Sequence, residues 1–180
     1  RGLIVTGVQT CALPIWHLLL ARRLCEAGCG FVTINSPAWD MHRGGNNPGI
    51  IEGMQTWSPH VDHAVSAFLE DLESRGMSDK ILLVITGEMG RTPRINKKGG
   101  RDHWGNLCSL MLAGGGWKMG QVIGKSDKQA ARPAADPVGP ENLMATIMHT
   151  LFDVGKLRVE RGLPSELVKK IDSTKPIPFL

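Results

Sequence analysis

Residues 81–93 read ILLVITGEMGRTP, an unbroken apolar run that is followed directly by glycine and polar side chains. A strand without alternation of apolar and polar residues is expected where helices cover both faces of a parallel sheet. The loop after such a strand begins at the sheet edge where open α/β proteins keep their functional sites. Residues 81–86 therefore predict a buried strand, and residues 87–105 predict a long loop that carries chemistry.

The segments around this strand alternate between helical and strand patterns. Apolar residues at helical spacing predict helices over residues 16–27, 58–76 and 141–152. Short apolar runs predict strands over residues 31–35 and 107–113, and a short edge strand over residues 121–123. This order of elements is typical of an α/β fold with a layered, mostly parallel sheet.

The composition fits one globular domain and excludes several classes of protein. The chain has 180 residues, of which 42% are hydrophobic, and its formal net charge is +4. Its longest aliphatic run, residues 81–85, is far shorter than the roughly 20 residues of a membrane-spanning helix. The basic residues form no block, so the charge gives no argument for a nucleic-acid partner. The cysteines form no CxxC motif and fix no cellular compartment.

The first fifteen residues stand apart from the rest of the chain. Residues 5–15 read VTGVQTCALPI, which resembles the translation of a common sequencing adapter. We expect residues 1–15 to be an assembly artefact joined to residues 16–180, which would be the C-terminal portion of a domain. A genuine edge strand with a turn at Pro14 is the alternative. Recovery of a continuous native gene that encodes residues 5–15 would overturn the artefact hypothesis.

Three clusters of polar residues lie at or beyond the ends of predicted strands. Residues 39–42, 87–93 and 99–104 read WDMH, GEMGRTP and GGRDHW. Carboxylates and imidazoles that converge from separate loops suit a divalent cation with mixed oxygen and nitrogen ligands, such as Zn²⁺ or Mn²⁺. On spacing alone, helix caps and ion pairs with nearby arginines explain these residues better than a metal does.

Four sequence blocks, taken together and in this order, resemble a known bacterial family. They are WDMH at 39–42, GEMGRTPRIN at 87–96, GGRDHW at 99–104 and LAGGGWKMGQVIGKSDK at 112–128. The family is catalogued as domain of unknown function 1501, which is itself sulfatase-like and similar to the alkaline phosphatase superfamily. The resemblance implies a partial three-layer α/β/α sandwich, alkaline phosphatase-like, with a mostly parallel sheet and truncated on its N-terminal side.

The resemblance also implies a metal site. Asp40 and His42 resemble the Asp/His pair that begins one metal site of the superfamily, and His103 resembles the distal histidine that completes it. Glu88 follows the buried strand where the superfamily places an adjacent pair of ligands, and Met89 stands in place of the second of them. The implied cofactor is a divalent metal, namely Zn²⁺, Mn²⁺ or Ca²⁺.

Other residues of the same blocks would surround that metal. Three arginines would bind the anionic group of a substrate through bidentate contacts or, equally, pair with carboxylates to order the loops: Arg91, Arg94 and Arg101. Three further residues would lie next to the ligands and either support them or line the site: Asp102, Trp39 and Trp104.

Two function classes remain open on these residues. The first is a metal-dependent hydrolase that acts on sulfate or phosphate esters, with an anionic ester or a sulfated carbohydrate as substrate. The second is a non-catalytic exported protein on the same fold, which would bind carbohydrate or a cell-surface partner. The nucleophile of the superfamily would precede Trp16, so we expect this fragment, without the N-terminal half of its domain, to be inactive. The resemblance further implies that the parent protein is exported, as a periplasmic protein.

Overall fold

One four-stranded sheet forms the centre of the computed structural model, which describes residues 2–6, 14–36 and 39–178. The strands lie in the order β2-β1-β3-β6, with the bounds Gly2–Thr6 for β1, Phe31–Ile34 for β2, Ile81–Thr86 for β3 and Leu110–Gly114 for β6. β1 is parallel to β2 and to β3, whereas β6 is antiparallel to β3. The reversal at β6 follows from its connection, because residues 87–109 contain no helix to carry the chain back for a parallel pairing.

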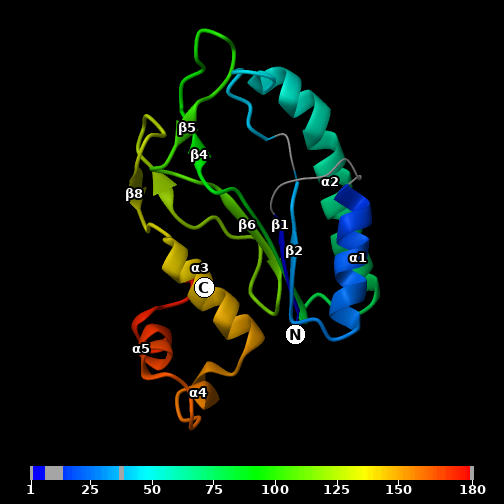
Figure 1. Ribbon diagram of the computed structural model, residues 1–180, viewed down its shortest axis with the longest axis vertical. Helices are drawn as coiled ribbons and strands as arrows, with labels where there is room; N and C mark the ends of the chain where they lie inside the picture. Colours follow the sequence, from blue (N-terminus) through cyan, green and yellow to red (C-terminus); the bar gives the residue numbers. More distant parts are fainter. Residues whose placement is uncertain (1, 7–13, 37–38, 179–180) are drawn as a thin grey trace.

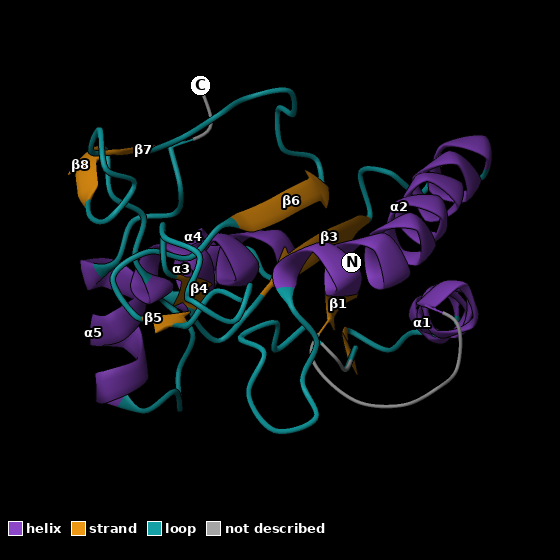
Figure 2. Cartoon of the chain, turned by 90° about the horizontal axis from the view of Figure 1, so that it is seen from above, coloured by secondary structure: helices purple, strands orange, loops and turns teal. Residues whose placement is uncertain are grey.

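Helices pack on both faces of this sheet (Figures 1 and 2). α1 (Pro14–Glu26) and α2 (Ile50–Ser74) cover one face, and α3 (Pro140–Leu151) covers the other. Alternate residues of β3 pack into two hydrophobic cores, one on each face of the sheet. Ile81 and Leu83 pack with α1 and α2, whereas Leu82 and Val84 pack with α3. All four side chains are at most 1% exposed, which explains why this strand has no polar position.

The start of α2 differs from the sequence prediction. The helix begins at Ile50 rather than at Ser58, and Pro59 lies inside it. Proline is commonest in the first turn of a helix because it has no backbone N–H. The predicted start was therefore placed too late, next to Pro59. The observed start is fixed from outside the helix, where the N–H of Ile50 donates to the carbonyl oxygen of Gly99 at 2.9 Å.

The short edge strand predicted over residues 121–123 is replaced by a hairpin farther along the chain. β7 (Lys125–Ser126) pairs with β8 (Pro133–Ala135), and residues 121–123 form no strand. Gly120 and Gly124 have φ angles of +80° and +82°, so the extended backbone is interrupted on both sides of the predicted strand.

Residues 2–6 form β1, which lies between β2 and β3 rather than at the edge of the sheet. Residues 1 and 7–13, which hold most of the adapter-like segment, lie outside the described residues. The hypothesis that residues 1–15 are an assembly artefact concerns the gene, and it stays a prediction.

The C-terminal part of the chain packs beside α3. It contains α4 (Val154–Leu157) and α5 (Ser165–Ser173), and the N–H of Ile177 donates to the buried hydroxyl of Thr146 on α3 at 2.8 Å. Within the described residues, no helix combines the length and the apolar character that crossing a membrane requires.

Candidate metal centre

Two loops meet where the parallel strands end. The first comprises residues 39–49, which follow β2, and the second comprises residues 87–105, which follow β3. The N–H of Arg101 donates to the carbonyl oxygen of Met41 at 2.9 Å and joins the loops through their backbones. At Gly100 an added Cβ would lie 2.3 Å from the carbonyl carbon of His42, so only glycine lets the two backbones approach this closely.

A short ladder positions the second loop. β4 (Gly90–Arg91) pairs antiparallel with β5 (His103–Trp104), and Arg91 lies directly opposite His103. In the first loop, the side chain of Met41 is buried against Gly53 of α2 and is only 2% exposed. Asp40 and His42, on either side of Met41, contact residues of the second loop.

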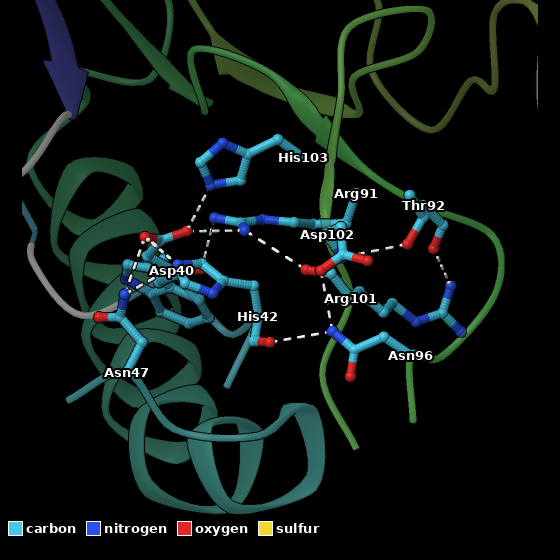
Figure 3. Close-up of polar contacts among 10 residues, drawn as sticks. Asp40, His42, Asn47, Arg91, Thr92, Asn96, Arg101, Asp102 and His103 are labelled. Carbon is cyan, nitrogen blue, oxygen red and sulfur yellow. Dashed lines mark hydrogen bonds and ion pairs between the residues drawn. The ribbon is translucent and has the colours of Figure 1, made fainter. Parts of the chain in front are cut away.

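Asp40, His42 and His103 form one cluster (Figure 3). His103 Nε2 lies 2.7 Å from Asp40 Oδ1, and His42 Nε2 lies 3.0 Å from Asp40 Oδ2. One donor atom from each of the three residues lies within 4.8 Å of the other two. The two imidazole rings meet edge to face, with centroids 5.5 Å apart. The Asp40 carboxylate thus lies between the two imidazoles, and three potential ligand atoms lie close together.

Arg91 shares this cluster. Its Nη1 lies 2.7 Å from Asp40 Oδ1, and its Nη2 donates to the carbonyl oxygen of Trp39 at 3.2 Å. Partial burial raises the pKa of the Asp40 carboxyl, but the hydrogen bonds from His103 and Arg91, together with nearby positive charge, outweigh this effect. The pKa of Asp40 falls from 3.8 to about 2, so the carboxylate remains available as a ligand at neutral pH.

A sequence profile described as "Protein of unknown function (DUF1501)" matches residues 16–172. The chain belongs to this family. No curated protein and no solved structure matches the chain.

The structure brings some of the DUF1501 site residues together and leaves others apart. Glu88 and Arg94 are exposed, and neither side chain forms a hydrogen bond or ion pair with another described residue, although the backbone carbonyl of Arg94 accepts from Thr92 Oγ1 at 2.8 Å. Arg101 donates to the carbonyl oxygens of Thr92 and Pro93 at 2.9 and 3.0 Å, so it braces its own loop. The cluster therefore contains Asp40, His42, His103 and Arg91, but neither Glu88 nor the other two arginines.

The residues predicted to support the ligands form hydrogen bonds with other parts of the protein and not with the ligands. Asp102 accepts a hydrogen bond from the side chain of Asn96 at 2.8 Å and forms no ion pair with the Arg101 guanidinium, whose hydrogen bonds go to backbone carbonyls. The indole N–H of Trp39 donates to Ser36 Oγ at 3.1 Å. The indole N–H of Trp104 donates to the carbonyl oxygen of Ala131 at 2.8 Å, which ties β5 to the β7–β8 hairpin.

Two asparagines of the DUF1501 site were not predicted from the sequence. Asn96 donates to the carbonyl oxygen of His42 at 3.0 Å as well as to Asp102, and its own oxygen accepts the N–H groups of Lys98 and Gly100. Asn47 contacts both Asp40 and His42. Asn96 is the last residue of the GEMGRTPRIN block, so the sequence offered a signal for it, whereas Asn47 lies in no quoted motif.

Proposed function

We propose that this DUF1501 chain carries a metal centre of a hydrolase that acts on sulfate or phosphate esters. The observation that carries the proposal is the convergence of Asp40, His42 and His103 from two loops at the carboxyl ends of parallel strands. In open α/β sheets this edge is the usual place for a functional site. The sequence blocks that resemble the sulfatase-like family supply the reaction class.

The donor set fits a borderline transition metal. One carboxylate and two imidazoles are the protein ligands of many catalytic zinc sites, which keep a fourth position open. Calcium prefers six to eight oxygen ligands, so two imidazoles favour Zn²⁺ or Mn²⁺ over Ca²⁺. Asp40 Oδ1 and His103 Nε2 are 2.7 Å apart, and only a small movement separates them to the distance between two ligands of one cation.

Each residue of the cluster has a role in this proposal. Asp40, His42 and His103 bind the cation, which when bound polarises the ester and stabilises negative charge on the reacting oxygens. Arg91 lies beside Asp40 with a fixed guanidinium, so it orients an anionic ester group next to the ligands. Asn96 and Asp102 hold the loop in place.

The metal is tested on this chain and the reaction on an intact family member with the same blocks. We expect the chain to bind Zn²⁺ in calorimetry and His103→Ala to lose that binding, whereas His60→Ala, at an exposed histidine of α2, keeps it. We expect the intact member to hydrolyse aryl sulfate or aryl phosphate esters with Zn²⁺ or Mn²⁺. A metal-loaded member that turns over neither ester would overturn the hydrolase, and an absence of metal binding would overturn the centre itself.

A non-catalytic protein on the same fold is the second candidate, and the packing around Asp40 favours it. Both oxygens of Asp40 already have partners, since Arg91 and His103 contact Oδ1 and Asn47 contacts Oδ2. Under this candidate the cluster only ties the two loops, and Asp40→Ala lowers thermal stability equally with and without a chelator. Export of the protein rests on the family resemblance alone, and cell fractionation of a family member tests it.

A further inference from the structure

Asn47 lies against the donor atoms of the cluster. Its side-chain amide nitrogen is 3.0 Å from Asp40 Oδ2 and 2.9 Å from His42 Nε2. Both of these atoms carry lone pairs that can bind a cation. The amide of Asn47 therefore faces the same space as the three proposed ligands (Figure 3).

We propose that Asn47 is a fourth protein ligand of this centre, through its amide oxygen. The inference rests on the metal centre proposed above. Rotation of the amide by half a turn exchanges its nitrogen and oxygen, which places the oxygen about 3 Å from the donor atoms of Asp40 and His42. Bonds of roughly 2.0–2.1 Å to one cation hold neighbouring ligand atoms roughly 2.8–3.4 Å apart, from octahedral to tetrahedral geometry. The position of the amide matches that spacing.

The loop between His42 and Asn47 is folded so that Asn47 returns to the cluster. The N–H of Asn47 donates to the carbonyl oxygen of Gly44 at 3.1 Å, and the N–H of Arg43 donates to the carbonyl oxygen of Pro48 at 3.1 Å. An added Cβ at Gly44 would lie 2.6 Å from the His42 ring, so glycine is needed for the ring to lie over the turn. Asn47 is half-buried as a result, whereas its neighbour Asn46 is exposed.

A ligand and a hydrogen-bond donor use different atoms of the same amide. A ligand role needs the oxygen, whereas a role that only orients Asp40 and His42 needs the N–H groups. Asn47→Asp keeps an oxygen and removes the N–H groups, and Asn47→Ala removes both. Asn46→Ala is the matched control, because it makes the same change at the adjacent exposed position.

The experiment compares the full chain with these three variants. Circular dichroism in the presence of a chelator first establishes that each variant is folded. Zn²⁺ affinity is then measured by competition with a chromophoric chelator, and the visible absorption of the Co²⁺-loaded protein reports the ligand atoms. We expect Asn47→Ala to weaken Zn²⁺ binding by at least about tenfold. We expect Asn47→Asp to bind at least as tightly as the wild type. Both variants should shift the Co²⁺ bands, and Asn46→Ala should change neither quantity.

Three results would overturn the ligand role of Asn47. Unchanged Zn²⁺ affinity and Co²⁺ bands in Asn47→Ala would do so and leave the three-residue centre standing. Weak binding by Asn47→Asp with wild-type Co²⁺ bands would assign Asn47 to hydrogen bonding alone. A wild-type chain that binds no metal would remove both the ligand and the centre. If Asn47→Ala does not fold, the Co²⁺ bands of Asn47→Asp decide, since wild-type bands there exclude the oxygen as a ligand.

Discussion

At the scale of single residues, Asp40 is the point on which the candidate centre converges. Its two oxygens are contacted by one guanidinium, two imidazoles and one amide, from Arg91, His42, His103 and Asn47. Hydrogen bonds from His103 and Arg91, together with the nearby charge of Arg91 and His42, hold the pKa of Asp40 at about 2 despite partial burial. Because the folded pKa lies below the ordinary value, folding favours the ionised carboxyl, and this contribution is present above about pH 4 and lost as the pH falls through about 2.

Asp40→Asn tests this contribution. In chelator at pH 7 we expect the variant to unfold with a free energy about 1 kcal/mol lower than that of the wild type, because the side chain is 40% exposed and solvent screens part of the effect. The difference should narrow between pH 4 and pH 2, where the wild-type carboxyl takes up a proton. Denaturant titrations at several pH values measure it. Asp62→Asn, at an exposed position of α2, should show no such change, and a gap that is equal at pH 7 and pH 2 would contradict the assignment.

At the scale of elements, α1 and α2 are joined by a charge as well as by apolar packing. Arg22 on α1 is only 4% exposed, and its Nε lies 2.6 Å from Asp71 Oδ2 on α2 in an ion pair without hydrogen-bond geometry. Glu26 contacts the same guanidinium, and Asp71 also accepts from Arg75 Nε at 2.7 Å. A buried charge depends on its partners, so this network fixes how the two helices lie against each other.

Asp71→Ala removes one partner of Arg22 and leaves the guanidinium buried. We expect the free energy of unfolding to fall by about 2 kcal/mol, less than for a wholly buried pair because Glu26 remains. Urea denaturation followed by circular dichroism measures the loss. Glu52→Ala breaks the exposed pair between Arg43 and Glu52 and should cost less than about 0.5 kcal/mol. Equal losses in the two variants would show that the buried network adds nothing.

The sequence predicted those elements whose patterns depend on local packing. β3 was placed correctly because its unbroken apolar run follows from burial on two faces. The start of α2 was misplaced because a contact from Gly99, distant in sequence, determines it. The same distinction holds at the site. Asp40, His42 and His103 carry recognisable chemistry in short motifs, whereas Asn47 acquires its position only from a turn built on glycines, which no local pattern specifies.

At the scale of the whole molecule, the candidate centre connects two loops that enter from different strands of one sheet. Residues 39–49 follow β2, residues 87–105 follow β3, and β1 lies between those strands. A cation held by Asp40, His42 and His103 links both loops, so binding stabilises the folded chain over the unfolded chain. At a free metal concentration of 100 times the dissociation constant this linkage is worth about 2.7 kcal/mol.

Zinc should therefore raise the thermal midpoint of the chain by about 5–10 °C relative to the chain in chelator. Differential scanning fluorimetry measures this gain. His60→Ala should retain the gain, and a gain that survives in His103→Ala would place the zinc elsewhere on the molecule.

The close approach of Gly100 to the backbone of His42 also limits how the sequence can drift. Any side chain at position 100 would push apart the two loops that carry the cluster, whereas Gly105, five residues farther along the chain, has open space around it. In a library in which both positions are randomised, survivors that keep the site should therefore be almost uniform at position 100 and varied at position 105. The contact between the two loops thus restricts position 100 whatever residues stand elsewhere in the chain.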